Sequence, residues 1–296
     1  MFSRVAIIGL GLIGGSVASG LRQRGLAAHV TAWDKQEAAL KEGAKRGVID
    51  SASASIADAI ADADLVILAV PMLAVQETFV AMRDVLGDDT IVTDVGSVKC
   101  AVFEAARQAF GEIPQNLVPG HPIAGSERHG VGAADPDVFA GHKVILTPKL
   151  STNGDATRAV REMWQALDAM VVEMDPEHHD LVLAQTSHLP HLLAYALVDT
   201  LSHQGDSLEI FEYAAGGFRD FTRIAASDPV MWRDIFAANS GPVLEILDRF
   251  TDDLARLRTL VSEGRTDELT EVFARAKTAR DHFSLLMAQR KPKGEH

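Results

Sequence analysis

The stretch "RVAIIGLGLIGGSVASGLRQRG", residues 4–25, passes from an apolar run through closely spaced glycines into a helical pattern that stops at Gly25. This order predicts a strand, a tight turn and a helix. A second strand, "HVTAW" at 29–33, leads to Asp34. Glycines spaced as GxGxxG, with an acid about 20 residues further on, are typical of a dinucleotide-binding βαβ unit. The amino end of the chain therefore predicts a Rossmann-type domain.

The glycines of this pattern have different predicted tasks. Gly9 permits the tight turn, Gly11 lets the backbone approach a pyrophosphate, and Gly14 lets the helix pack closely on the strand. The first turn of the helix offers unpaired N–H groups to the phosphate. The alternative is that the glycines only shape a loop. The predicted cofactor contacts are Gly9, Gly11, Leu12, Ile13, Gly14, Asp34, Val70 and Pro71.

Asp34 decides the predicted form of the cofactor. Its carboxylate is placed to accept hydrogen bonds from the adenosine ribose and to repel a 2′-phosphate, which favours NAD over NADP. Lys35 and Arg46 are basic neighbours that would soften this preference.

The composition limits the class of protein. A length of 296 residues allows two domains with their own cores. A net charge of -13 argues against a nucleic-acid partner, because phosphate backbones require clustered Lys and Arg. An anionic ligand therefore needs a locally positive site. Cys100 is the single cysteine, so no internal disulfide is possible, and we expect a reducing, cytoplasmic location.

The uncharged run at 5–21 follows Arg4 and ends in small residues, as a signal peptide does. Glycines interrupt the run, and its removal would delete the first strand of the predicted domain. We therefore assign it to the fold. No other stretch approaches the roughly 20 apolar residues of a membrane span, so we expect no membrane partner.

Apolar segments continue to alternate with helical segments as far as Asp175, which predicts a doubly wound, mostly parallel sheet. The predicted strands lie at 65–70, 90–96, 115–120, 142–148 and 170–175. Ligands of such sheets bind at the carboxyl ends of the strands. Val70 with Pro71, Ser97 with Lys99, and His121 on a loop between Gly120 and Pro122 all occupy such ends.

After Asp175 the sequence predicts helices only. Asp175 is placed to cap a helix that begins at Pro176, so the expected domains are 1–175 and 176–290, with a tail at 291–296. Within this helix, Pro190 removes a backbone donor and should kink or locally open the backbone.

Two further helices are expected between 243 and about 287. Their apolar residues recur at helical spacing and form either core or a subunit interface. They are Leu244, Leu247, Phe250, Leu254, Leu257, Leu260, Leu269, Val272 and Phe273.

His121 is the candidate general base, because an imidazole with an ordinary pKa near 6.5 accepts a proton near neutrality; a structural role is the alternative. Arg223 is the candidate anchor for a substrate carboxylate, since its guanidinium binds two oxygens at once. Pairing with Asp220 or Asp228 is the competing interpretation. Ser97 is placed to cap the following helix and also to contact the substrate.

His188 and His191 lie three residues apart on one helix face, which is a spacing that metal ligands also use. No Asp, Glu or Cys completes such a site within one turn, so no metal is expected.

Five motifs in this order resemble the prephenate and arogenate dehydrogenases of tyrosine biosynthesis, and the likeness covers essentially the whole chain. They are "GLGLIGGS" at 9–16, "DVGSVK" at 94–99, "GHPIAGSE" at 120–127, "SHLPH" at 187–191 and "GFRDFTRIAASDPVMW" at 217–232. The resemblance implies a Rossmann domain, a helical domain that forms a homodimer, and an active site between them. It also implies oxidation and decarboxylation of prephenate, arogenate or both, with NAD⁺ taking the hydride and without a metal.

The same resemblance implies roles for individual residues. His121 would accept the proton of the ring hydroxyl, beside Ser97, which would bond that hydroxyl and the nicotinamide. Arg223 would bind a carboxylate of the dianionic substrate. His188, His191 and Trp232 would line the pocket around the ring and the side chain.

Two other classes compete with this interpretation. The β-hydroxyacid dehydrogenases also join a Rossmann domain to a helical one, and they resemble one another in using a lysine of the helical domain as base. This chain has no lysine between Lys149 and Lys277, which argues against that class. A non-catalytic dinucleotide-sensing module would leave His121 and Arg223 without tasks.

Overall fold

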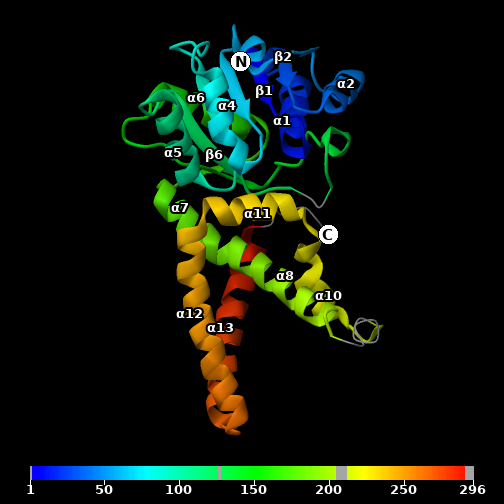
Figure 1. The fold of residues 1–296 in the computed structure, drawn as a ribbon, viewed down its shortest axis with the longest axis vertical. Helices are drawn as coiled ribbons and strands as arrows, with labels where there is room; N and C mark the ends of the chain where they lie inside the picture. Colours follow the sequence, from blue (N-terminus) through cyan, green and yellow to red (C-terminus); the bar gives the residue numbers. More distant parts are fainter. Residues whose placement is uncertain (1, 126–127, 205–211, 291–296) are drawn as a thin grey trace. The chain divides into compact units, whose positions relative to one another are not determined.

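The structure is a computed structural model that describes residues 2–125, 128–204 and 212–290 (Figure 1). Ser126 and Glu127 of the "GHPIAGSE" motif, and the tail expected at 291–296, lie outside the described residues. The chain divides into two compact units, Met1–Val243 and Leu244–His296. The first contains the sheet and every predicted site residue.

An eight-stranded sheet forms the centre of the first unit, in the order β3-β2-β1-β4-β5-β6-β7-β8. The strands are β1 Phe2–Ile8, β2 Ala27–Trp33, β3 Ser51–Ala52, β4 Leu65–Leu68, β5 Ile91–Asp94, β6 Leu117–Pro122, β7 Lys143–Leu146 and β8 Met170–Glu173. The order reverses between β1 and β4, which is where a doubly wound sheet opens a crevice for ligands. The predicted fold class is confirmed.

Two features of the sheet differ from the expectation. β3 is only two residues long and carries no alternating pattern that would predict it. β6 pairs with β7 in the antiparallel direction, with His121 opposite Ile145. Because this pairing extends β6 through Pro122, His121 stands within a strand and not on the predicted loop. The strand fixes its backbone at the carboxyl end of the sheet.

Helices cover both faces of the sheet. α1 (Leu12–Gln23), α2 (Glu37–Lys45) and α6 (Gly154–Ala166) pack on one face. α3 (Ile56–Ile60), α4 (Val75–Met82) and α5 (Lys99–Phe110) pack on the other. Side chains of a strand alternate between faces, so β1 supplies apolar residues to both cores. The short 3₁₀ turns are η1 Met72–Ala74 and η2 Val131–Ala133.

The glycine turn between β1 and α1 is closely packed. Gly9 has a φ of +99°, and a Cβ on Gly14 would stand 2.1 Å from the carbonyl oxygen of Gly9. A Cβ on Gly11 would meet no atom within 4 Å. Gly9 and Gly14 are therefore required by the fold itself, whereas Gly11 borders open space.

The first helical run after the sheet contains α7 (Pro176–Leu183), a π-helical turn η3 (Ala184–His188) and α8 (Leu189–Ser202). Asp175 caps α7 by accepting a hydrogen bond from the His178 N–H at 3.1 Å, as predicted. In the π turn the N–H of Leu189 bonds the carbonyl of Ala184, five residues earlier. The predicted opening near Pro190 is therefore this π turn.

The continuous run Pro176–Ser202 is long and apolar enough to cross a membrane, judged by length and composition alone. This differs from the expectation that no second run of that kind exists. Histidines and Pro190 interrupt its apolar residues, and His179 and Asp180 within it are buried.

The remaining helices of the first unit are α10 (Gly216–Thr222), the 3₁₀ turn η4 (Arg223–Ala226) and α11 (Pro229–Ala238). α11 packs on η1, and its Trp232 and Ile235 join the core beside α4 and α5. α7 in turn packs on α5. Figure 1 shows α7, α8, α10 and α11 together beyond one end of the strands.

The second unit consists of most of α12 (Ser240–Ser262) and of α13 (Thr266–Arg290), which confirms the two predicted helices. Several of their large apolar side chains are exposed, namely Leu244, Leu254, Val261, Phe273, Phe283 and Leu285. Part of the predicted stripe is therefore not covered within the described chain.

The glycine turn yields a test of the fold. We expect Gly14→Ala to lower the free energy of unfolding by about 1–3 kcal/mol, because its Cβ would clash with the backbone of Gly9. Gly11→Ala is the matched control and should cost at most about 1 kcal/mol, the difference between glycine and alanine at a helix cap. Urea denaturation of the NAD-free protein measures both. Equal losses in the two variants would contradict the packing role of Gly14.

Candidate active site

The amino end of α1 has the properties of a phosphate site. Its cap residue is Gly11, which has no side chain to bond the first N–H groups of the helix, and the first turn holds no acidic residue. The space next to Gly11 is open. Free N–H groups at a helix start attract anions, so the turn fits the pyrophosphate of a dinucleotide. The loop after β4 adjoins it, because a Cβ on Gly9 would lie 3.1 Å from the nitrogen of Val70.

Asp34 stands at the end of β2, beside the glycine turn. Its Oδ2 accepts a hydrogen bond from the Leu10 N–H at 2.7 Å, and its Oδ1 accepts one from the Gln36 N–H at 2.7 Å. These bonds fix the carboxylate where the motif places a ribose. Arg46 pairs with Glu42 at 2.6 Å, which reduces its availability to a 2′-phosphate.

His121, part-buried at the end of β6, begins a chain of hydrogen bonds into α7. Its Nδ1 lies 2.9 Å from Nε2 of His179, and Nδ1 of His179 lies 2.8 Å from Oδ1 of Asp180. His179 is fully buried and Asp180 is 2% exposed. Burial, followed by the neighbouring His179, Lys99 and His188, holds the pKa of His121 well below its usual 6.5.

Asp180 also caps α5 from outside that helix. Its Oδ1 accepts the Lys99 N–H at 2.8 Å and its Oδ2 accepts the Cys100 N–H at 2.9 Å. Burial alone would raise the pKa of Asp180, but the hydrogen bonds from His179 and these backbone groups outweigh it and lower the pKa. Asp180 is therefore ionised.

The predicted capping role of Ser97 is wrong. The cap residue of α5 is Val98, which offers no side-chain acceptor, and the acceptor comes from Asp180 instead. Ser97 lies part-buried in the turn between β5 and α5, at the carboxyl edge of the sheet. Its predicted contact with the substrate stays a prediction.

A buried ion pair lies directly behind His121. Nζ of Lys99 donates to Oδ2 of Asp94 at 2.5 Å and to the Gly120 carbonyl at 2.7 Å. Asp94 also accepts the N–H of Gly120 and of Gly96. Desolvation lowers the pKa of Lys99, while Asp94 opposes that shift. The pair joins the ends of β5 and β6 and brings a positive charge close to His121.

The predicted pocket residues of the helical run come together around one indole. The rings of His191 and Trp232 stack with centroids 3.8 Å apart, and the His188 ring lies 6.0 Å from the same indole. His191 donates from Nδ1 to the Ser187 carbonyl at 2.8 Å, which leaves Nε2 as an acceptor. The indole N–H of Trp232 is buried without a partner among the described residues.

His188 lies deeper than His191, at 1% exposed. The side-chain amide of Asn239 donates to its Nδ1 at 3.1 Å and to the Asp180 carbonyl at 2.9 Å. Burial lowers the pKa of His188 to about 4, so the ring is neutral. Its Nε2–H is then a buried donor without a partner among the described residues. His188 also makes a small contribution to the lowered pKa of His121.

Arg223 opens η4, which packs on α8, and its side chain is exposed. Burial is the main cause of the lowered pKa of His191, and the positive charge of Arg223 contributes in the same direction. Asp228 and Asp220 are the alternative partners that the sequence offers for Arg223. In the structure Asp228 caps α11 by accepting the Val230 and Met231 N–H groups, and Asp220 accepts a hydrogen bond from Arg219.

The residues that the sequence did not single out are His179, Asp180 and Asn239. Each reaches the site through a contact across 51 or more residues of chain, so no local motif marks them. Among residues 2–125, 128–204 and 212–290, no group of three His, Cys, Asp or Glu side chains is arranged to hold a metal.

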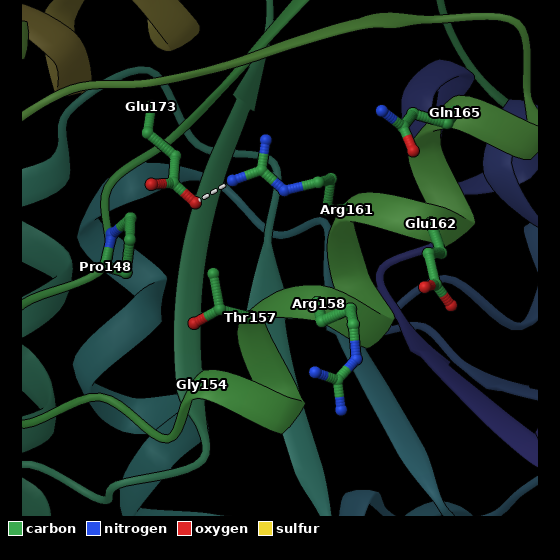
Figure 2. A pocket seen from close by; sticks show the side chains of 8 residues that line it. All are labelled: Pro148, Gly154, Thr157, Arg158, Arg161, Glu162, Gln165 and Glu173. Carbon is green, nitrogen blue, oxygen red and sulfur yellow. Dashed lines mark hydrogen bonds and ion pairs between the residues drawn. The ribbon is translucent and has the colours of Figure 1, made fainter.

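A hollow of about 520 Å³ lies elsewhere, over α6 and β8 (Figure 2). Its lining includes Arg158, Arg161 and Glu173, and Figure 2 shows the ion pair between the last two. It contains none of the predicted site residues. We therefore place the chemistry at the strand ends and not in this hollow.

Comparison with known proteins identifies the family. Residues 17–173 match the model "Prephenate dehydrogenase, nucleotide-binding domain", and residues 175–275 match "Prephenate dehydrogenase, dimerization domain". The chain is 38% identical to the cyclohexadienyl dehydrogenase of Zymomonas mobilis over 95% of its own length and 96% of the relative. It is 35% identical to the prephenate dehydrogenase of Bacillus subtilis, covering 96% of this chain and 77% of that protein.

A solved structure gives the same result. The prephenate dehydrogenase of Aquifex aeolicus, in complex with hydroxyphenyl propionate and NAD⁺, superposes with a TM-score of 0.88 at 36% identity, over 96% of this chain and 99% of that one. The resemblance inferred from the five motifs is confirmed. The chain belongs to the prephenate dehydrogenase family of oxidoreductases.

Proposed function

We propose that the protein catalyses the NAD⁺-dependent oxidative decarboxylation of prephenate, of arogenate or of both, and so forms 4-hydroxyphenylpyruvate or tyrosine. The observation that carries this proposal is the position of His121. It stands at the end of a strand of the nucleotide-binding sheet, and His188 contributes to its lowered pKa. The His188 ring lies 6.0 Å from the Trp232 indole, on which His191 stacks. Arg223 in turn contributes to the lowered pKa of His191. We assign the base, the aromatic rings and the cation to one substrate site.

The cofactor is assigned to the glycine turn and its neighbours. Gly11 and the first N–H groups of α1 would hold the pyrophosphate, Asp34 the ribose, and Val70 with Pro71 the adjoining wall. Leu12 and Ile13, in the first turn of α1, would contact the dinucleotide from the helix side. When bound, NAD⁺ supplies the acceptor for the hydride that leaves the substrate ring.

His121 is assigned the proton of the ring hydroxyl. A base must be neutral to accept a proton, and the lowered pKa of His121 keeps the ring neutral at pH 6.5, where an ordinary histidine is half protonated. Activity that depends on it is therefore present above the lowered pKa and is lost as the pH falls through it. Ser97, at the same edge of the sheet, is assigned a hydrogen bond to that hydroxyl and to the nicotinamide.

Arg223 is assigned a substrate carboxylate. Its guanidinium supplies positive charge to a dianion that must approach a protein of net charge -13. His191 and Trp232 form a flat stacked surface suited to the substrate ring, and the Nε2 lone pair of His191 can accept a hydrogen bond. His188 is assigned a contact with the substrate through its Nε2–H, which has no partner among the described residues.

We further propose a homodimer that forms through the helical half. The exposed apolar side chains of α12 and α13 support it, since such patches mark protein interfaces. Residues 1–175 then form the nucleotide-binding half and 176–290 the substrate and dimer half. We place the enzyme in the cytoplasm, where its single cysteine remains reduced.

Purified protein should reduce NAD⁺ when prephenate or arogenate is added. Formation of NADH is followed by absorbance, with each substrate in turn and with NADP⁺ in place of NAD⁺. We expect a higher kcat/KM with NAD⁺, because the Asp34 carboxylate repels a 2′-phosphate. No NADH with either substrate would refute the proposed function.

His121→Asn should lower kcat by at least about 100-fold with little change in KM, because it removes a proton acceptor needed in the transition state. His142→Asn, at an exposed histidine outside the site, is the matched control and should behave as the wild type. Steady-state assays at saturating NAD⁺ measure both variants. A normal kcat in His121→Asn would remove this residue from the chemistry.

Arg223→Ala should raise KM for the substrate by about 10- to 150-fold, the value of hydrogen bonds to a charged group. The affinity for NAD⁺ should not change. Arg219→Ala, at an exposed arginine one turn earlier, serves as control. If NAD⁺ binding weakened while the substrate KM remained normal, the arginine would belong to the cofactor site instead.

A further inference from the structure

We propose that His179 and Asp180 are positioning residues that hold the imidazole of His121 in one tautomer, with the proton on Nδ1 and the lone pair of Nε2 directed to the substrate. The inference rests on the proposed role of His121 as base. It adds two residues from the helical half, neither of which touches the reacting atoms.

The Asp180 carboxylate fixes the direction of the first hydrogen bond. Its two oxygens accept three N–H groups, those of Lys99, Cys100 and the His179 ring, at 2.8 to 2.9 Å. The carboxylate is ionised and thus only accepts hydrogen bonds. Nδ1 of His179 must therefore carry a proton and donate it to Oδ1 of Asp180.

This assignment fixes the other nitrogen of His179. In the proposed arrangement the ring of His179 is neutral, with one donor and one acceptor, so its Nε2 carries the lone pair. Its partner at 2.9 Å is Nδ1 of His121, which must then be the donor. Nε2 of His121 is left without a proton, as a general base requires. The opposite arrangement would place two lone pairs or two protons against each other at one of the contacts.

The same chain also stabilises the product of proton transfer. When the O–H bond of the substrate breaks, its electron pair stays on the substrate oxygen and its proton bonds to the lone pair of His121 Nε2, so the ring becomes an imidazolium. Its Nδ1–H continues to donate to His179, whose own N–H points at the negative Asp180. A carboxylate that orients a catalytic histidine acts in this way in hydrolytic triads, where loss of its charge costs about 10⁴-fold in kcat.

The positioning residues are held from two sides. The start of α5 holds the carboxylate of Asp180, and the Asn239 amide holds its backbone carbonyl. Lys99 adds a positive charge near His121, which disfavours protonation of the ring before substrate arrives. The groups that face His121 are thus His179 with Asp180 from α7, Lys99 from α5 and His188 from the π turn.

Four variants test the proposal. Asp180→Asn replaces the carboxylate acceptor with an amide that can donate to His179. The tautomers of His179 and of His121 would then both be reversed. We expect kcat to fall by about 10²- to 10⁴-fold. His179→Phe removes the acceptor for His121. His179→Gln can restore that acceptor through its amide oxygen and should recover about 10-fold of the kcat that His179→Phe loses. His178→Gln is the exposed control on the same helix and should retain wild-type kcat.

Four readouts separate positioning from mere support of the fold. NAD⁺ affinity and the melting temperature report folding. The pH profile reports protonation: raising the pH should not restore Asp180→Asn, since its defect is the tautomer. Nitrogen NMR of histidine-labelled protein, with the His121 signals assigned from the spectrum of His121→Asn, reports the tautomer directly and requires no turnover.

We expect the proton of His121 on Nδ1 in the wild type and on Nε2 in Asp180→Asn. A wild-type proton on Nε2, or His179→Phe with undiminished kcat, would overturn the proposal. If Asp180→Asn fails to fold, the His179 pair and the wild-type spectrum still decide it. Failure of the wild type to oxidise prephenate or arogenate would refute the proposed function instead, and the tautomer would still be measured.

Discussion

The hydrogen bonds of the Asp180 carboxylate to the start of α5 are the contact on which the site depends. A helix of the sheet-bearing half lacks a cap of its own, and a helix of the following half supplies one. The unpaired N–H groups and the partial positive charge at the start of α5 stabilise the carboxylate, and the carboxylate satisfies those groups in return. Asp180 is also hydrogen-bonded to His179, which contacts His121. The packing of α7 on α5 therefore also determines the position of the proposed base.

The buried pair of Lys99 and Asp94 adds a second constraint. Burying two charges is costly unless their remaining hydrogen-bonding groups are satisfied, and here Gly120 and Gly96 satisfy several of them. The pair therefore fixes the ends of β5 and β6 relative to each other. His121 follows directly after Gly120, so its backbone is held by the sheet while its ring is held by α7. A side chain held from both directions keeps its geometry through a reaction cycle.

The sequence predicted the parts of this site that local pattern specifies. The glycine turn and Asp34 lie within one βαβ unit, and His121 was placed at the sheet edge because it follows an apolar strand. The sequence did not predict that Asp180 caps α5, because Asp180 and Lys99 are 81 residues apart and neither residue lies in a recognisable local motif for this contact. Ser97 was a reasonable cap by residue type, but a tertiary contact replaced it. The direction of β7 was missed for a similar reason, because apolar alternation is the same in parallel and antiparallel strands.

The π turn before Pro190 determines the angle about the helix axis at which the side chains after it project. One additional residue in a turn rotates the later part of a helix by about 100° relative to a regular helix. His191, which stacks on Trp232, stands beyond the π turn, and His179, which bonds His121, stands before it. The turn therefore changes the angle about the helix axis between these two side chains. In evolution, the insertion of one residue into a helix can therefore change which of its side chains face the same site, without any change in the helix ends.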